Sequence, residues 1–134
     1  MEITGQILEN YLFERIRSLS LPITGKFYKR GTRPMGSKKE DCVVGFISGN
    51  SNQIQEGECV VNIYVNDIMA RDGQYYKDFS RCVELEALMV AIPGELNTLG
   101  NIRFEKSDIV RTFEERDLNQ HYVSLKLKYK HLNS

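Results

Sequence analysis

The side chains of this chain that are best suited to bind a partner are the basic ones of residues 26–39. This stretch holds six of the eighteen Lys and Arg residues and no Asp or Glu. Ammonium and guanidinium groups form charge-assisted hydrogen bonds with carboxylates and phosphates. We therefore predict a basic loop that contacts a partner, with these contact residues: Lys29, Arg30, Arg33, Lys38 and Lys39.

Three interpretations of the basic loop stay open at the level of sequence. The first is contact with nucleic acid, in which Phe27 and Tyr28 stack on bases while neighbouring cations neutralise phosphates. The second is a protein arm that reaches an acidic surface on a neighbouring copy. It suits a chain whose eighteen acidic residues balance its eighteen basic ones. The third is a solvated loop without a partner, and of the three we favour the protein arm.

The backbone of the basic loop is expected to be irregular and to project from the surface. Arg33 precedes Pro34, which biases it to an extended conformation. Gly31 and Gly36 allow the chain to bend without a side-chain penalty. Because exposed charges contribute little to stability, we expect replacement of Lys29, Arg30 and Arg33 by Glu to disrupt assembly and to change the melting temperature little.

Enzymatic chemistry has weaker support in the sequence. His121 and His131 are ten residues apart, a spacing that gives no reason to place them at one metal ion or one proton-transfer step. The acids Glu114 and Glu115 alternate with basic residues in a segment that we expect to be a solvated loop. An enzyme would need a cleft in which one of these acids meets His121 across the sheet. We expect no enzyme activity, no cofactor and no metal ion.

The three cysteines indicate a reducing environment. Cys42, Cys59 and Cys82 are 17 and 23 residues apart, and these spacings match no common metal-binding motif. An odd number of thiols also leaves one outside any scheme of disulfides. We expect all three to be reduced and buried, as small apolar side chains of a cytoplasmic protein. No apolar stretch approaches the roughly 18 residues of a membrane span, so we expect no membrane contact.

The elements that must hold these side chains alternate between helix and strand. The chain has 134 residues, a length that suits a single domain. Apolar spacing and turn residues predict a helix between Thr4 and Pro22, a second helix over residues 78–92, and strands over residues 26–29, 42–47, 58–66, 101–105 and 122–130. This order predicts an α+β fold, in which two main helices pack on one face of an antiparallel or mixed β-sheet and a long basic loop leaves it.

Two of these elements are predicted in more detail. Residues 58–66, with the sequence ECVVNIYVN, have the strongest β character, and their apolar residues on both faces predict a central strand. Residues 49–57 before it are expected to form a turn. The second helix is expected to end at Pro93 and Gly94. Its apolar face is expected to consist of Phe79, Cys82, Val83, Leu85, Leu88, Met89 and Ile92.

Short motifs stand in a distinctive order along the chain. They are Arg33-Pro34, Gly36-Ser37, Glu40-Asp41 and Val43-Val44, then VVNIYV at residues 60–65 and LNQHYVS at residues 118–124. With these motifs the chain resembles small, largely uncharacterised prophage proteins of gut bacteria. Through them it is similar to the tail-terminator and head-tail joining proteins of tailed phages, the family of minor tail protein U of phage lambda. The match covers about residues 28–127 in the order of the elements.

The resemblance implies a non-enzymatic structural protein that assembles with copies of itself into a ring, commonly a hexamer. Such a ring caps the tail tube and joins it to head-completion proteins, in the cytoplasm of the bacterial host during assembly and afterwards in the virion. The resemblance also implies that the sheet forms the body of the ring, while residues 29–39 reach a neighbouring subunit or the tube. A nucleic-acid-binding module that uses residues 26–39 is the alternative.

Overall fold

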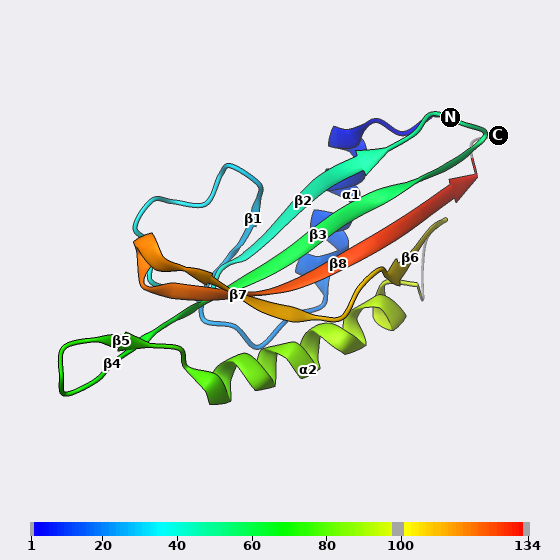
Figure 1. The fold of residues 1–134 in the computed structure, drawn as a ribbon. Coiled ribbons are helices and arrows are strands. Elements are labelled where there is room, and N and C mark those ends of the chain that lie inside the picture. Colours follow the sequence, from blue (N-terminus) through cyan, green and yellow to red (C-terminus); the bar gives the residue numbers. More distant parts are fainter. Residues whose placement is uncertain (1, 98–100, 133–134) are drawn as a thin grey trace.

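The protein is built around one long, twisted β-sheet (Figure 1). The computed structural model describes residues 2–97 and 101–132. The strands of the main sheet are β1 (Phe27–Lys29), β2 (Cys42–Gly49), β3 (Ile54–Asn66), β6 (Ile102–Lys106), β7 (Arg111–Glu115) and β8 (Gln120–Leu132). They follow the order β1-β2-β3-β8-β6, and β7 also pairs with β8. Only β1 and β2 are parallel, so the predicted α+β fold with a mixed sheet is confirmed.

The long strands β2, β3 and β8 form the centre of the sheet. β3 lies between the other two, which confirms the predicted central strand. Its pairing with β8 runs along the whole length of both strands. The prediction that residues 49–57 form a turn is wrong, because β2 extends to Gly49 and β3 already begins at Ile54. The two strands thus form a long hairpin that carries the sheet beyond the helices that cover its middle (Figure 1).

Helix α1 (Gly5–Ser18) begins where the sequence predicts. The hydroxyl of Thr4 accepts a hydrogen bond from a backbone N–H three residues on (3.3 Å), which satisfies one of the free donors of the first turn. The helix buries Leu8, Leu12 and Ile16, spaced four residues apart along one face. This face packs on β1 and β2.

Helix α2 (Phe79–Leu96) packs along β8 and β6. The sequence predicts that Pro93 and Gly94 end it near Glu95; it does end close by, at Leu96, but Pro93 lies inside the helix and does not stop it. Ile92 and Leu96, on either side of the proline, are both buried, and their packing continues the apolar stripe for a further turn. The predicted burial of Phe79 and Val83 is also wrong, since they are 67% and 47% exposed.

The outer edge of β8 carries two short strands in succession, β6 and β7. The prediction of a solvated loop at Glu114 and Glu115 is wrong, because both residues lie in β7. A short 3-10 helix, η1 (Arg116–Leu118), and Asn119 in the left-handed conformation (φ 52°) reverse the chain between β7 and β8. This tight turn places the polar segment beside β8, where it pairs as an antiparallel strand and Phe113 stacks on Tyr122.

A two-stranded hairpin, β4 (Ile68–Met69) and β5 (Tyr75–Tyr76), connects β3 to α2. It projects from the body at the end of the molecule opposite the termini (Figure 1). Its turn includes Gly73 at φ 82°, a conformation that glycine adopts without strain. The sequence predicts a loop at residues 71–73 but not the strands beside it.

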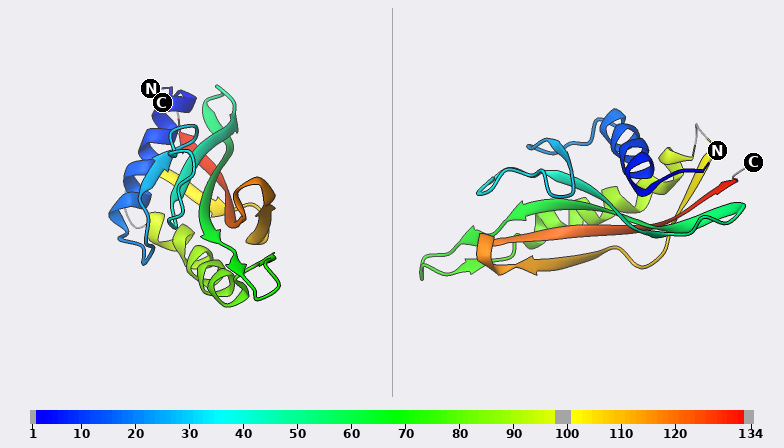
Figure 2. Two further views of the ribbon diagram at one scale, coloured as in Figure 1. Left: turned by 90° about the vertical axis from the view of Figure 1, so that its left-hand side faces the viewer. Right: turned by 90° about the horizontal axis from the view of Figure 1, so that it is seen from above.

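Both helices lie on the same side of the sheet (Figure 2), as predicted. Between helices and sheet lies one hydrophobic cluster that includes all three cysteines, which are free and buried as expected. Burial raises the pKa of these thiols. Among the described elements no helix covers the other face of the sheet, and we call this face the open face. No helix in the described part of the chain is long and apolar enough to cross a membrane.

The central position of β3 makes its inward side chains essential to the fold. Ile63 is fully buried between the sheet and the helices. We expect Ile63→Ala to lower the free energy of unfolding by about 2–5 kcal/mol, because the substitution leaves a cavity in a packed core. Urea denaturation measures this loss. The matched control is Ile54→Ala on the same strand, where the side chain is 51% exposed and the loss should stay near about 0.5 kcal/mol.

Candidate functional site

The basic loop (residues 26–39) folds back onto the end of the sheet instead of projecting freely. The side chain of Arg33 is only 12% exposed. Its Nε donates to Oδ2 of Asp41 (2.9 Å), and its Nη1 donates to Oε1 of Gln120 (3.2 Å). Its Nη2 donates to the carbonyl oxygens of Ser37 and Lys39 (both 3.3 Å). The expectation that Arg33 projects from the loop is therefore wrong, and its contacts lead us to expect a structural role instead.

The carboxylate of Asp41 is the centre of this network and is 1% exposed. It also accepts hydrogen bonds from the hydroxyl of Ser37 (2.5 Å) and from the backbone N–H of Lys26 (3.0 Å). Burial raises the pKa of Asp41, but its hydrogen bonds with Ser37, Lys26 and Arg33 outweigh that effect and hold the pKa below its ordinary value. Asp41 therefore stays ionised in the interior. We call Arg33, Ser37, Asp41 and Gln120 the Arg33–Asp41 network.

A second ion pair holds the end of the basic loop against α2. Arg81 of the helix donates through Nε and Nη2 to the two carboxylate oxygens of Glu40, each at 2.8 Å. This fork-shaped pairing is the strong geometry for a guanidinium and a carboxylate. The hydrogen bond from Arg81 lowers the pKa of Glu40. Of the two acids that follow the basic segment, Asp41 thus pairs with Arg33 of the segment, whereas Glu40 pairs with Arg81 of α2.

A row of aromatic rings crosses the open face from the basic loop to β7. The guanidinium of Arg33 lies 3.9 Å from the ring centre of Tyr64 on β3. Ring centres are 5.4 Å apart between Tyr64 and Tyr122, and 5.3 Å apart between Tyr122 and Phe113. At the far end, the guanidinium of Arg111 lies 4.9 Å from the ring of Phe113. The row joins the loop, β3, β8 and β7 by stacking and cation–π contacts.

The remaining predicted contact residues are placed in two ways. Nζ of Lys29 donates to a side-chain oxygen of α1 (2.8 Å), and Nη1 of Arg30 donates to the carbonyl oxygen of Phe46 on β2 (3.3 Å). Lys38 and Lys39 are exposed. The described hydrogen bonds and ion pairs include none from the side chain of Lys38 or Lys39 to the body of the protein. These two of the five predicted residues therefore extend from the loop.

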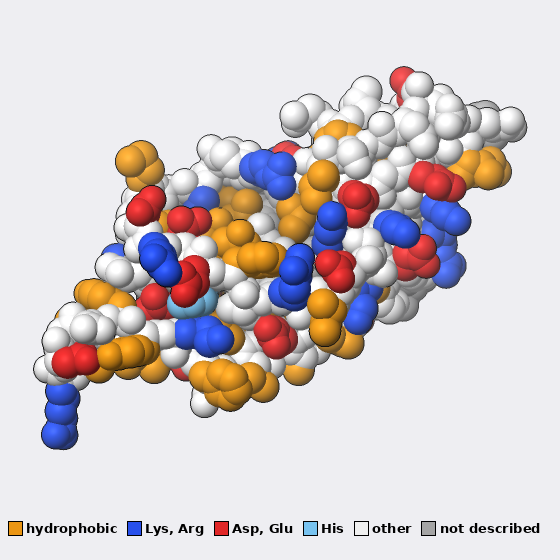
Figure 3. Space-filling view, in the orientation of Figure 1, with side chains coloured by type: hydrophobic (Ala, Val, Ile, Leu, Met, Phe, Trp, Pro, Cys, Tyr) orange, Lys and Arg blue, Asp and Glu red, His pale blue; other side chains and the backbone are white. Residues whose placement is uncertain are grey.

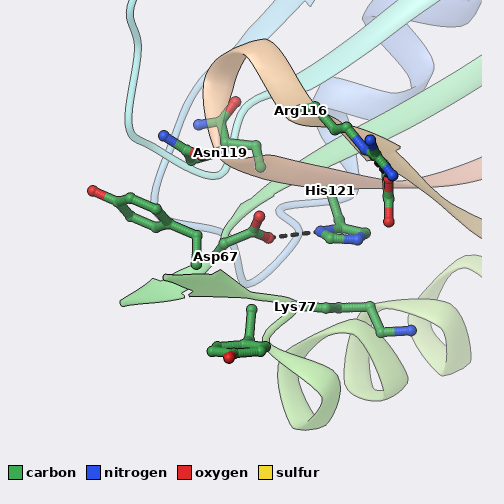
Figure 4. A pocket seen from close by; sticks show the side chains of 9 residues that line it. Asp67, Lys77, Arg116, Asn119 and His121 are labelled. Atoms are coloured by element: carbon green, nitrogen blue, oxygen red, sulfur yellow. Dashed lines mark hydrogen bonds and ion pairs between the residues drawn. The ribbon is translucent and has the colours of Figure 1, made fainter. Parts of the chain in front are cut away.

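A pocket of about 520 Å³ lies at the base of the β4–β5 hairpin (Figure 4). Within it, Nδ1 of His121 and Oδ1 of Asp67 are 2.6 Å apart, and both side chains are mostly buried. The N–H of Asp67 also donates to the carbonyl oxygen of Asn119 (3.0 Å). The pair therefore fastens the start of the hairpin to the start of β8. The pocket is lined by Asp67, Tyr75, Tyr76, Lys77, Glu114, Arg116, Asn119, Gln120 and His121.

The pocket also tests the geometry that an enzyme would need. Glu114 lies opposite His121 in the pairing of β7 with β8. However, the Glu114 carboxylate pairs with Arg116 (2.8 Å), and His121 pairs with Asp67. Across residues 2–97 and 101–132, no group of three or more His, Cys, Asp and Glu residues is arranged to hold a metal ion. Both side chains line the pocket, but each is held by a different partner: Glu114 by Arg116, and His121 by Asp67.

The open face contains a second hollow, of about 320 Å³, which we call the open-face pocket. The central strands supply Val60, Asn62 and Tyr122, while apolar side chains from the flanking segments include Ile47 and Ile109. The basic residues Arg30, Arg111 and Lys126 also line it. In the space-filling view, hydrophobic side chains gather in the middle of this face, with acidic and basic side chains around them (Figure 3).

The β4–β5 hairpin exposes large apolar side chains on both of its faces. Ile68 and Tyr76 pair across the strands, as do Met69 and Tyr75, and all four are between 47% and 63% exposed. The sequence analysis missed this feature. The signal that could have found it is Asp72-Gly73, a favoured hairpin turn, between two pairs of apolar residues.

Comparison with known proteins does not assign the chain to a family. No protein-family model matches it, and no curated protein matches it. What the protein does is therefore argued from its own residues and their arrangement.

The Arg33–Asp41 network generates a stability prediction. Arg33→Ala should lower the free energy of unfolding by about 3–5 kcal/mol, because it leaves the buried Asp41 carboxylate without its charged partner. The matched control is Lys38→Ala in the same loop, which should change stability by no more than about 0.5 kcal/mol. Urea denaturation compares the two. Equal small losses would show that Arg33 is not structural.

The lowered pKa of Asp41 generates a prediction about pH. Because the folded pKa lies below the ordinary value of 3.8, the stability due to the carboxylate is fully present well above that pH. It is lost as the pH falls through the folded pKa. Asp41→Asn should therefore cost about 3–5 kcal/mol at pH 7 and less at pH 3, measured by denaturation at both pH values. A difference independent of pH would contradict this role.

Proposed function

We propose that this protein is a non-enzymatic structural component of a phage or prophage. In this proposal it is a tail terminator or head-tail connector that acts through ring-forming contacts between copies of itself. Its further partners would be the tail tube or head-completion proteins. It would act in the cytoplasm of the bacterial host during assembly and then remain in the virion.

The observation that carries the proposal is the projecting apolar hairpin. A two-stranded hairpin is marginally stable by itself and is normally stabilised by packing on other elements. Here Ile68, Met69 and Tyr76 are each at least half exposed, and Phe79 at the start of α2 is 67% exposed. Contiguous exposed apolar side chains in a soluble protein mark an interaction surface. A protein partner that covers the hairpin is thus the function class that best fits this surface.

The motifs behind the family resemblance meet in one place in the structure. Arg33, Ser37, Asp41 and Gln120 belong to the Arg33–Asp41 network, and Tyr64 stacks on it. These residues come from the segments RP, GS, ED, VVNIYV and LNQHYVS. The motifs behind the resemblance thus include residues that hold the loop to the sheet.

The alternative function is a nucleic-acid-binding module that uses residues 26–39. The observation in its favour is that Arg30, Lys38 and Lys39 are exposed. Against it, the guanidinium of Arg33 is occupied by Asp41 and Gln120, which leaves fewer cations for phosphates.

Sedimentation velocity over a range of protein concentrations, with and without a short DNA duplex, tests the proposal. We expect a discrete species whose size is that of a ring. Its amount should rise with protein concentration, and it should not bind the duplex. Electron microscopy of that species should show closed rings. A monomer at every concentration would contradict the proposal. A complex with the duplex that dissociates as salt rises would instead favour the nucleic-acid alternative.

A further inference from the structure

We infer that the β4–β5 hairpin of one copy docks in the open-face pocket of the next copy. This inference rests on the proposed function, because it names the contact from which a ring would be built. The occupant of the pocket is thus a second copy of this chain, and the docked segment is Ile68–Tyr76 with its turn.

The hairpin is suited to insertion because apolar side chains cover both of its faces. Ile68 and Tyr76 share one face, and Met69 and Tyr75 share the other. A hairpin that packs on its own body would bury one of these faces, but all four side chains are exposed by about half or more. An element with two apolar faces is covered best when it enters a hollow that contacts both.

The open-face pocket offers matching groups. Ile109 and Ile47, which are 69% and 41% exposed, and the partly buried Tyr122 provide apolar contact area. The side-chain oxygen of Asn62 is buried and accepts no hydrogen bond within the described part of the chain. Since buried acceptors normally have a donor, an N–H group of a docked hairpin would satisfy it.

Charge also favours this pairing. The open-face pocket is lined by three cations, Arg30, Arg111 and Lys126, and by one acid, Asp108. The turn of the hairpin presents Asp72, whose pKa is lowered by hydrogen bonds from the N–H of Gln74 and the hydroxyl of Tyr76, so the carboxylate is ionised at neutral pH. The turn also carries the exposed Arg71, and Arg111 and Lys126 of the pocket pair with Asp108 and Glu58. Both surfaces thus present charges of both signs, and matching them fixes the orientation of docking.

The positions of the two surfaces dictate the symmetry of the assembly. The hairpin projects from one end of the molecule, whereas the open-face pocket lies over β3, β8 and β7 in its body (Figures 1 and 3). Each copy therefore offers one hairpin and one pocket on different surfaces. When each hairpin docks on a further copy the contact is heterologous, and repeating it yields a closed ring or an open filament. Two copies that exchange hairpins reciprocally would form a twofold dimer instead, and the size of the assembled species distinguishes the two.

Three single substitutions at exposed residues test the docking. Met69→Asp damages the hairpin and leaves the pocket intact, and Ile109→Asp damages the pocket and leaves the hairpin intact. Ile54→Asp is the matched control, because Ile54 is an exposed isoleucine (51%) away from both surfaces. Thermal unfolding of each variant first verifies that it is folded. Sedimentation velocity then compares all three with the natural protein.

We expect the control to assemble like the natural protein. Met69→Asp and Ile109→Asp should each need at least about tenfold more protein to assemble, since each removes an apolar contact from the centre of the interface. The decisive sample is an equimolar mixture of these two variants. One intact hairpin and one intact pocket remain in the mixture, so it should form a one-to-one dimer and stop there.

Other outcomes separate this inference from the proposed function. If the natural protein and all three variants form rings alike, the ring stands and the docking of hairpin in pocket is wrong. If Met69→Asp fails to assemble but Ile109→Asp assembles normally, the hairpin meets another surface and the inference is again overturned. If the natural protein itself is monomeric at every concentration, the proposed ring function is contradicted as well.

Discussion

The buried carboxylate of Asp41 is the constraint from which the arrangement of this molecule follows. A charge that is 1% exposed is tolerable only when donors surround it. Arg33, the hydroxyl of Ser37 and the N–H of Lys26 are those donors. Because Arg33 also donates to Gln120, 87 residues further along the chain, the same network joins the basic loop to the start of β8.

Holding the basic loop in this way changes what the surface can offer to a partner. The guanidinium of Arg33 is turned inward, and the carboxylate of Glu40 is occupied by Arg81 of α2. The loop therefore presents fewer free charges than its composition suggests. The β4–β5 hairpin exposes apolar side chains on both faces, whereas the pocket on the open face combines apolar side chains with Arg30, Arg111, Lys126 and Asp108.

The aromatic row extends the same constraint across the sheet. Arg33 stacks on Tyr64, and the rings of Tyr122 and Phe113 continue the row to β7. These side chains cover part of the open face next to the pocket, where no described helix packs. The pocket is bounded on one side by this row, so the network that fixes the loop also shapes the site where we propose that a second copy docks.

The sequence alone determined the elements whose signals are local. The cap at Thr4, the stripe of Leu8, Leu12 and Ile16, and the apolar alternation around Ile63 each report a periodicity of helix or strand, and the α+β class followed from their order. Only the tertiary structure decided the rest. Whether Arg33 faces solvent or Asp41, whether the polar segment of β7 pairs with β8, and whether α2 continues past Pro93 each depend on a partner distant in sequence. Composition records a side chain's charge but not the neighbour that neutralises it, and that neighbour decides between a free contact residue and a structural one.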